Sequence, residues 1–272
     1  MKKLKISIIT PSYNQGEFIE DTILSVIGQG YDNYEYIIID GGSKDDTVEI
    51  IKKYESKIYY WVSEKDKGQT DAINKGMKKA TGDIVCWINS DDVLLPNALN
   101  IVANYFNRNA DLEFLNGLSI EIDRKGYVKK LTHIFQNKWF ARNGCFNVCQ
   151  QGMFWKKSVF NKVGYLDETF HGCMDWEFIV RLYENDVKMA QFNKPLGAIR
   201  IYGETKTAMG GKIWLNDWKK IANRYSGQYI HKRKSIFFIL YAFIKLFKGY
   251  YISDIIFKVK HKNRKFNSIT IE

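Results

Sequence analysis

Two adjacent carboxylates, Asp91 and Asp92, directly follow residues 84–89, a segment apolar enough to be a buried strand. Pro96 comes shortly afterwards and is typical of the first turn of a helix. In open α/β sheets, ligands bind just beyond the carboxyl ends of the strands. Two acids at such a position suit Mg²⁺ or Mn²⁺, which prefer oxygen ligands and often bridge a protein carboxylate to substrate phosphates. The alternative is that one of the two acids only caps the helix near Pro96.

The hydrophobic pattern predicts the elements that must position these acids. Strand and helix patterns alternate over the first 110 residues, which indicates βαβ units and a mostly parallel sheet flanked by helices. The predicted strands here are 4–10, 34–40, 58–62 and 84–89, and the predicted helices are 17–27, 43–54 and 71–79. Further on, the pattern predicts strands at 112–115, 118–122, 188–192 and 197–202, a hairpin turn at 125–126, and helices at 175–184 and 213–225. We therefore expect an α/β fold with one catalytic domain, residues 1–227, followed by a tail, residues 228–272.

Small and polar residues end the first two predicted strands. Pro11-Ser12-Tyr13 follows the first strand and Asp40-Gly41-Gly42 follows the second, so the two segments can form two walls of a nucleotide crevice. Tyr13 offers a face on which a base can stack, and Asp40 can accept hydrogen bonds from a uracil-like edge or a ribose. Gly42 lets the backbone approach a flat ligand closely. The alternative for Asp40 is that it only caps the turn that follows it.

Lys75 lies in a helical pattern that faces the same edge of the sheet. Its ammonium group could therefore contact a phosphate of the ligand. The alternative is a solvated lysine beside Lys78 and Lys79, and the residues themselves do not decide between the two.

Six short motifs follow one another along the chain: Ser7-Ile8-Ile9-Thr10-Pro11-Ser12-Tyr13-Asn14, Ile37-Ile38-Ile39-Asp40-Gly41-Gly42-Ser43 with Asp46-Thr47, Asp71-Ala72-Ile73-Asn74-Lys75-Gly76, Ala80-Thr81-Gly82-Asp83, Asn89-Ser90-Asp91-Asp92 and Met174-Asp175-Trp176-Glu177. This is the order found in family 2 glycosyltransferases of the GT-A fold, and residues 5–202 resemble that family. Within the family, Asp66-Lys67-Gly68-Gln69 before Asp71 is most similar to a branch that makes bacterial O-antigen and capsule glycans. Each motif alone is weak evidence, but six in series are strong evidence.

The resemblance implies a reaction and a set of roles. The reaction is an inverting transfer of a sugar from a nucleoside diphosphate sugar, expected to be UDP-linked, to a hydroxyl of a lipid-linked or polysaccharide acceptor. Asp92 is expected to be the main ligand of Mn²⁺ or Mg²⁺, while Asp91 supports the ribose or the metal, and Ser90 contacts the nucleotide sugar. Asp175 is expected to be the general base that takes the proton of the attacking hydroxyl. Helix capping is the alternative for Asp175.

Three further residues are expected to contact the sugar or the acceptor. Gln151 stands where many relatives have the Gln of a His-Gln pair, and it is expected to contact the sugar or the acceptor. Trp176 is expected to provide an apolar platform for the acceptor, or else to be buried in the core. Glu177 is expected to orient the acceptor, or else to lie at the surface.

One segment departs from the family pattern. Relatives often carry a His after the base that can complete the metal shell, but Tyr202 stands at that position in Arg200-Ile201-Tyr202-Gly203-Glu204. A phenol stays protonated at neutral pH and is a poor ligand for a divalent cation. The metal shell is therefore expected to be completed by water and phosphate, or by Glu204.

The tail carries most of the net charge of +11. Residues 231–265 hold ten Lys and Arg residues and a single acid, Asp254. Within this stretch, residues 235–247 are strongly apolar but too short to span a bilayer. Apolar, aromatic residues with cationic flanks are typical of a helix that lies on an anionic membrane surface. The alternative is a helix that covers the catalytic domain.

The four cysteines, Cys86, Cys145, Cys149 and Cys173, form no CxxC pair and have no His at zinc spacing, which favours a reduced compartment. With the basic tail, this predicts a cytoplasmic protein that is peripheral on the inner face of the cell membrane.

Other function classes fit the sequence less well. A nucleic-acid-binding protein could use the basic tail, but the charge avoids the predicted domain and no recognition motif is present, so we expect no nucleic-acid partner. A nucleotidyltransferase would need a phosphate loop rich in Gly and Arg after the first strand, where this chain has Pro11-Ser12-Tyr13-Asn14. A catalytically inactive relative that binds glycans remains the main alternative.

Overall fold

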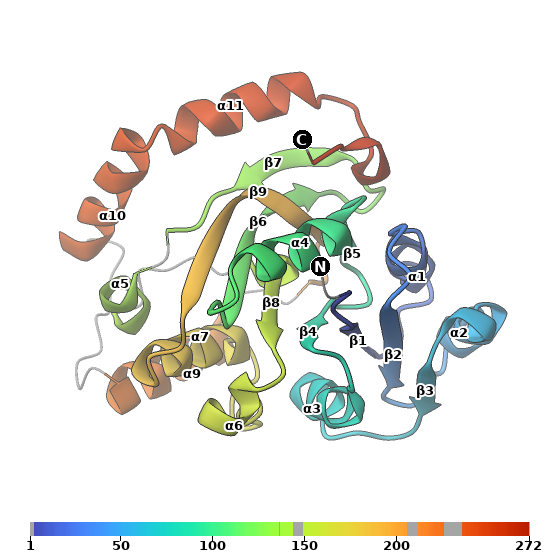
Figure 1. The fold of residues 1–272 in the computed structure, drawn as a ribbon. Helices are drawn as coiled ribbons and strands as arrows, with labels where there is room; N and C mark the ends of the chain where they lie inside the picture. Colours follow the sequence, from blue (N-terminus) through green and yellow to red (C-terminus); the bar gives the residue numbers. More distant parts are fainter. Residues whose placement is uncertain (1–2, 136, 144–148, 206–210, 226–235, 272) are drawn as a thin grey trace.

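The computed structural model describes residues 3–135, 137–143, 149–205, 211–225 and 236–271. Its centre is a nine-stranded sheet with the strand order β3-β2-β1-β4-β8-β6-β9-β5, in which β7 pairs with β6 (Figure 1). The strands are β1 Ile6–Ser12, β2 Tyr34–Asp40, β3 Tyr60–Ser63, β4 Ile84–Trp87, β5 Val93–Leu94, β6 Phe114–Ile122, β7 Val128–Thr132, β8 Met153–Lys156 and β9 Met189–Arg200.

Helices cover both faces of this sheet (Figure 1). They are α1 Ile19–Ile27, α2 Thr47–Lys53, α3 Gln69–Lys79, α4 Ala98–Arg108, α5 Lys138–Arg142, α6 Val159–Val163, α7 Met174–Glu184, α9 Lys212–Tyr225, α10 Ile236–Phe247 and α11 Tyr250–Lys260, with short 3₁₀ turns η1 Glu55–Lys57, η2 Gln150–Gly152 and η3 Phe266–Ser268. The predicted α/β fold is confirmed.

The strand order places a ligand crevice beside β1. Strands β3, β2, β1 and β4 are parallel, and β1 pairs with β2 on one side and with β4 on the other. The chain therefore reverses its direction of travel across the sheet between β1 and β4, which is where α/β sheets bind ligands. Beyond β4 the sheet is mixed, because β8 is antiparallel to both β4 and β6 while β9 is parallel to β6.

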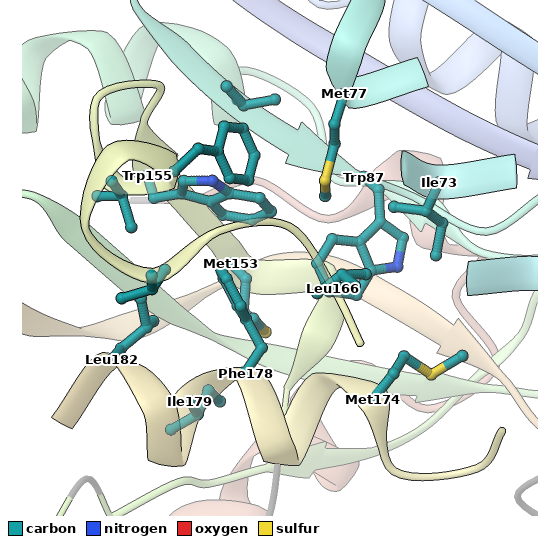
Figure 2. Close-up of a cluster of buried hydrophobic side chains, with 14 of the residues drawn as sticks. Ile73, Met77, Trp87, Met153, Trp155, Leu166, Met174, Phe178, Ile179 and Leu182 are labelled. Atoms are coloured by element: carbon teal, nitrogen blue, oxygen red, sulfur yellow. The ribbon is translucent and has the colours of Figure 1, made fainter. Parts of the chain in front are cut away.

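Alternating residues of the parallel strands fill two separate cores. Ile9 and Ile39 point toward α3 and α7, whereas Ile8 and Ile38 point toward α1 and α4. Figure 2 shows part of the first core, where side chains from the sheet, α3 and α7 meet; the labelled residues are Ile73, Met77, Trp87, Met153, Trp155, Leu166, Met174, Phe178, Ile179 and Leu182.

The backbone of α3 lies very close to β1 because of a glycine. A Cβ atom at Gly76 would come within 2.4 Å of the Ile9 side chain. This close packing holds the second half of α3 against the middle of β1.

Two predicted strand pairs are single strands in the structure. The predicted strands 112–115 and 118–122 are parts of β6, and 188–192 and 197–202 are parts of β9. The predicted hairpin turn at Lys125-Gly126 is confirmed, with Gly126 at a φ of 83°. The predicted boundary between domain and tail, at residues 227 and 228, lies outside the described residues.

A buried carboxylate on β2 links the start of the sheet to the loop before β4. Glu35 accepts hydrogen bonds from the Ser7 hydroxyl at 2.6 Å and from the Thr81 amide at 2.5 Å, and it pairs with Lys5 at 2.6 Å. Burial opposes ionisation of Glu35, but the hydrogen bonds from Lys5, Ser7 and Thr81 lower its pKa to about 2. Glu35 therefore stabilises the fold as an anion.

We expect Glu35→Gln to lower the free energy of unfolding by about 2–3 kcal/mol at pH 7, as the lowered pKa implies. Since the folded-state pKa lies below the unfolded one, this contribution is complete above about pH 4.5 and disappears as the pH falls to about 2. Urea unfolding at several pH values measures it, with Glu49→Gln, an exposed carboxylate on α2, as the control. A difference between wild type and variant that stays constant from pH 7 to pH 3 would contradict this account.

Candidate active site

A cavity of about 590 Å³ opens beyond the carboxyl ends of β1 and β4. Its walls come from the loop after β1, the beginning of α3, the loop after β4 and the end of β9. The lining residues are Pro11, Ser12, Tyr13, Gln15, Gly41, Lys65, Asp66, Gly68, Gln69, Ala72, Asn89, Ser90, Asp91, Asp92, Ile199, Arg200, Tyr202, Glu204 and Thr205. Six predicted site residues therefore share one cavity: Pro11, Ser12, Tyr13, Ser90, Asp91 and Asp92.

The Asp92 side chain is only 2% exposed, and its carboxylate accepts three hydrogen bonds from the protein. One carboxylate oxygen accepts hydrogen bonds from the side-chain amides of Gln151 at 2.7 Å and Asn89 at 3.0 Å, and the other accepts from the Arg200 backbone N–H at 2.9 Å. Burial and the neighbouring Asp91 charge raise the pKa of Asp92, although these hydrogen bonds favour its ionised form. A cation beside the pair would relieve both effects.

Asp91 faces a phenol rather than an imidazole. The Tyr202 hydroxyl donates a hydrogen bond to Asp91 Oδ2 at 3.0 Å, and the Tyr202 ring lies 4.7 Å from the Phe18 ring. Burial and the Asp91 charge raise the pKa of Tyr202, so its phenol stays protonated at neutral pH. Tyr202 therefore orients Asp91. Glu204 also lines the cavity, where it pairs with Arg124 at 3.3 Å.

Arg200 was not predicted as a site residue, yet it links the walls of the cavity. Its side chain is buried, and it donates hydrogen bonds to the backbone oxygens of Asp91 at 2.9 Å and Arg124 at 2.8 Å. It also pairs with Asp21 at 2.9 Å. The side chain thus ties the loop after β4 to α1 and to the β6–β7 turn, while its backbone N–H holds Asp92.

The chemistry of Asp91 and Asp92 fits a divalent cation. Both are carboxylates on adjacent residues that line the cavity, and oxygen ligands suit Mg²⁺ and Mn²⁺. Within the described part of the chain, no cluster of three or more His, Cys, Asp and Glu side chains could hold a metal. Two protein carboxylates leave ligand positions for phosphate oxygens and water, as is usual for Mg²⁺.

The beginning of α3 forms the opposite wall, and its residues were also missed as site residues. The Gln69 side chain donates to the Asn89 side-chain oxygen at 2.8 Å, which connects α3 to the loop that bears Asp92. Gly68 has a φ of 116°, and its N–H donates to Asp66 at 2.8 Å. The Asp66-Lys67-Gly68-Gln69 motif was the only sequence signal for this wall.

Three predicted nucleotide contacts are not among the described residues that line the cavity. Asp40 is buried and accepts hydrogen bonds from the Gly42 and Ser43 amides and from the Ser43 and Ser63 hydroxyls, so it fixes its own turn. Gly42 has a φ of 83°, which this turn requires. Lys75 pairs with Glu64 and Asp71. Direct contacts of these residues with a nucleotide stay predictions.

Asp175 lies in the first turn of α7, and it is likewise not among the described cavity residues. One carboxylate oxygen of Asp217 on α9 accepts the amides of His171, Gly172 and Cys173, at 2.9, 2.7 and 3.1 Å. Just before them, the Phe170 carbonyl accepts from the Thr70 hydroxyl at 3.2 Å. Since Thr70 follows the cavity residue Gln69, these bonds bring the chain leading to Asp175 against the beginning of α3.

Glu177 does not lie at the surface, so that alternative for it is wrong, and its expected role in orienting the acceptor stays a prediction. Its side chain is fully buried, and its carboxylate accepts hydrogen bonds from Arg181 at 2.8 Å, Arg224 at 3.3 Å and the Tyr225 hydroxyl at 2.5 Å. It therefore joins α7 to α9. The carboxylate can be buried because its three partners supply hydrogen bonds and opposite charge in place of water.

Two other predicted acceptor contacts also have internal partners. Trp176 lies in the core, as its alternative stated: its Nε1 donates to the Ala141 carbonyl at 2.8 Å, and its ring meets the Trp218 ring at 5.4 Å. Gln151 is buried, where its amide donates to Asp92 and accepts from Ser119 at 3.3 Å. Gln151 thus positions Asp92 and is not among the cavity's lining residues.

Comparison with known proteins agrees with this arrangement. The model of the family described as glycosyl transferase family 2 matches residues 7–175. An uncharacterized glycosyltransferase of Mycobacterium tuberculosis is 32% identical over 182 residues, which cover 65% of this chain and 68% of the relative. The putative teichuronic acid biosynthesis glycosyltransferase TuaG of Bacillus subtilis is 40% identical over 90 residues, or 32% of this chain and 36% of TuaG. The match to an uncharacterized glycosyltransferase of Rickettsia typhi spans only 38% of that relative.

Solved structures share the fold. TarS residues 1–349 of S. aureus, in complex with UDP-GlcNAc, give a TM-score of 0.63 at 17% identity over 80% of this chain and 64% of that one. The mannosyltransferase PcManGT of Pyrobaculum calidifontis, in complex with GDP-Man and Mn²⁺, gives 0.55 at 13% identity over 93% and 84%. The family match covers more than half of the sequence, and the fold is that of the GT-A enzymes. The chain belongs to glycosyl transferase family 2.

Proposed function

We propose that this chain is an inverting glycosyltransferase. It moves a sugar from a nucleoside diphosphate sugar, specifically a UDP-sugar, to a hydroxyl group of a glycan acceptor. The observation that carries the proposal is the single cavity that contains Pro11-Ser12-Tyr13 at the end of β1 and Ser90-Asp91-Asp92 after β4. The complex of TarS with UDP-GlcNAc supports this donor class, because TarS has the same fold.

In this proposal the donor lies across the cavity. Tyr13, which is 59% exposed at the wall, stacks on the base, and Ser12 and Ser90 contact the nucleotide. Asp92 and Asp91 hold Mn²⁺ or Mg²⁺, which when bound offsets charge on the leaving diphosphate. The complex of PcManGT with Mn²⁺ supports the choice of metal. Gln151, Asn89 and the Arg200 N–H keep Asp92 in place for this role.

Asp175 is the proposed base. The acceptor oxygen attacks the anomeric carbon, its proton passes to the Asp175 carboxylate, and the bond from the anomeric carbon to the diphosphate oxygen breaks. The nucleoside diphosphate leaves with the electron pair of that bond. One displacement with no covalent intermediate inverts the anomeric configuration.

The acceptor in this proposal is a lipid-linked or polysaccharide glycan at the inner face of the cell membrane. The name of TuaG, which refers to teichuronic acid biosynthesis, supports a cell-surface glycan. The exposed apolar side chains of the C-terminal helices support a membrane location.

We expect UDP-sugars to raise the thermal unfolding temperature only with Mn²⁺ or Mg²⁺ present, and the product to have the opposite anomeric configuration to the donor. A thermal-shift screen of UDP- and GDP-sugars, with EDTA as the control, identifies the donor. NMR of the product, with a lipid-linked glycan or a soluble surrogate as acceptor, then gives the anomeric configuration. Retention of configuration would refute the displacement mechanism, and donor binding without transfer or hydrolysis would favour a catalytically inactive relative.

A further inference from the structure

Helices α10 and α11 expose a continuous set of large apolar side chains. We call this set the apolar plate; its members, between 47% and 86% exposed, are Ile239, Leu240, Phe243, Leu246, Phe247, Tyr251, Ile252, Ile255, Ile256 and Val259. Among the described residues, the other exposed large apolar side chains are Tyr13, Leu24, Tyr59, Tyr127 and Trp139, and none of them belongs to α10 or α11. A monomeric soluble protein rarely exposes an apolar patch of this extent without a partner.

The opposite faces of the two helices are already used for packing. Tyr241 of α10 is buried against Phe140, with ring centroids 5.4 Å apart. On α11, the Tyr250 ring stacks on His133 at 4.4 Å, and Asp254 accepts the Leu131 amide at 3.0 Å. Figure 1 shows both helices along the outer edge of the molecule, with α11 beside β7. The plate is therefore a second apolar face on helices whose first face is docked.

The charges around the plate indicate what covers it. Asp254, the single acid between residues 231 and 265, points toward β7 and pairs with Lys258. Exposed cations that flank the plate are Lys248, Lys260, Lys262, Arg264 and Lys265. A second copy of the chain would bring two cationic rims together, which opposes association. An anionic lipid surface matches both the cations and the apolar residues.

We propose that the apolar plate inserts into the interface of an anionic bilayer, with α10 and α11 lying flat on the membrane. No helix in the described parts of the chain has the length and apolar character needed to cross a bilayer. A flat interfacial helix needs one apolar face and cationic flanks, and both helices have them. This deepens the membrane location proposed above, but lipid binding requires no sugar donor, so the two proposals fail in distinguishable ways.

Hydrogen bonds connect the segment after α11 to the β6–β7 turn, and this turn contacts a residue of the cavity. The Arg264 carbonyl accepts the Val128 amide at 3.0 Å, and the Phe266 amide donates to the Gly126 carbonyl at 3.1 Å. In the same turn, Arg124 pairs with the cavity residue Glu204. A bilayer bound to the plate is thus held at a fixed orientation to the cavity, which suits an acceptor that is itself anchored in lipid.

Vesicle flotation of the full chain tests the proposal. We expect the wild type to float with vesicles that contain about one third phosphatidylglycerol, and to float much less with phosphatidylcholine alone. Ile255→Glu with Ile256→Glu should weaken binding by roughly a hundredfold or more, because two exposed apolar groups are replaced by anions. Lys260→Gln with Lys262→Gln should weaken binding to anionic vesicles by about tenfold or more. The matched control, Leu24→Glu with Tyr59→Glu, changes two exposed apolar residues outside α10 and α11 and should float like the wild type.

A second measurement detects insertion of the apolar plate directly and does not depend on a variant that loses binding. Ile256→Cys labelled with a polarity-sensitive dye should shift its emission to the blue on addition of anionic vesicles, whereas Tyr59→Cys with the same label should not. The proposal would be overturned if the wild-type protein did not float with anionic vesicles. It would also be overturned by flotation that the isoleucine variants leave unchanged or that the Leu24 and Tyr59 control also abolishes. Self-association through the plate without lipid binding, seen by light scattering, would assign the plate to a second copy instead.

Discussion

Asp175→Asn is expected to lower kcat by about 10²- to 10⁴-fold while the affinity for the donor changes little, since general-base assistance is worth that much in rate. The amide cannot take the proton of the acceptor hydroxyl. It can still accept the Trp176 N–H, which donates to Asp175 Oδ1 at 2.8 Å, so the first turn of α7 should keep its geometry. Initial rates at saturating donor measure kcat, and the donor-induced thermal shift measures binding.

The control for this experiment is Asp111→Asn. Asp111 is an exposed carboxylate that pairs with Lys188, and it is not among the residues that line the cavity. Its substitution should leave both kcat and donor binding at wild-type values. If Asp175→Asn kept its rate within about tenfold, the general base would be another residue.

Asp92→Asn is expected to abolish the metal-dependent stabilisation by the donor and to lower kcat/KM by about 10²- to 10³-fold, the size of effect found when one electrostatic group at a reacting centre is removed. The variant loses the anionic ligand, and its NH₂ group must face one of the three N–H donors that surround Asp92. That mismatch costs about 1–3 kcal/mol. Removing a buried charge whose pKa is raised by burial and by Asp91 offsets part of this cost.

The measurement is the thermal unfolding temperature with and without Mn²⁺ and UDP. The wild type should gain stability when both are present, and Asp92→Asn should not, although it unfolds cooperatively in their absence. Asp111→Asn again serves as the control and should respond like the wild type. A metal-dependent shift that survives in Asp92→Asn would remove Asp92 from the metal site.

The sequence predicted the ends of the parallel strands well because the signal there is local. A short apolar run followed by polar or small residues marks both Ser12 and Asp91, and the strand order then brings the two loops to one edge. The cavity therefore contains the residues that follow β1 and β4 in the chain. No long-range information was needed to predict this part of the site.

The contacts that support Asp92 could not be predicted in the same way. Arg200 lies 108 positions away from Asp92, and Gln151 lies 59 positions away. Nothing near either residue marks it as a partner of a carboxylate. The surface alternative for Glu177 was wrong for the same reason, because its partners Arg224 and Tyr225 belong to a helix much later in the chain.

The division of β6 into two predicted strands has a steric explanation. Asn116-Gly117 interrupts the apolar run and looked like a break between strands. In the structure, a Cβ atom on Gly117 would lie 2.6 Å from the Leu196 side chain, and one on Gly152 would lie 2.4 Å from the Gly117 carbonyl oxygen. The glycine keeps the strand continuous at a crowded crossing of β6, β9 and η2.

Asp217 holds the segment that leads to the proposed base, and it comes from a part of the chain that does not line the cavity. Its carboxylate anchors the three amides before α7, whereas the residues that line the cavity lie between positions 11 and 92 and between 199 and 205. In the proposed mechanism, a substitution of Asp217 would therefore disturb the backbone that leads to the base without removing any side chain that lines the cavity.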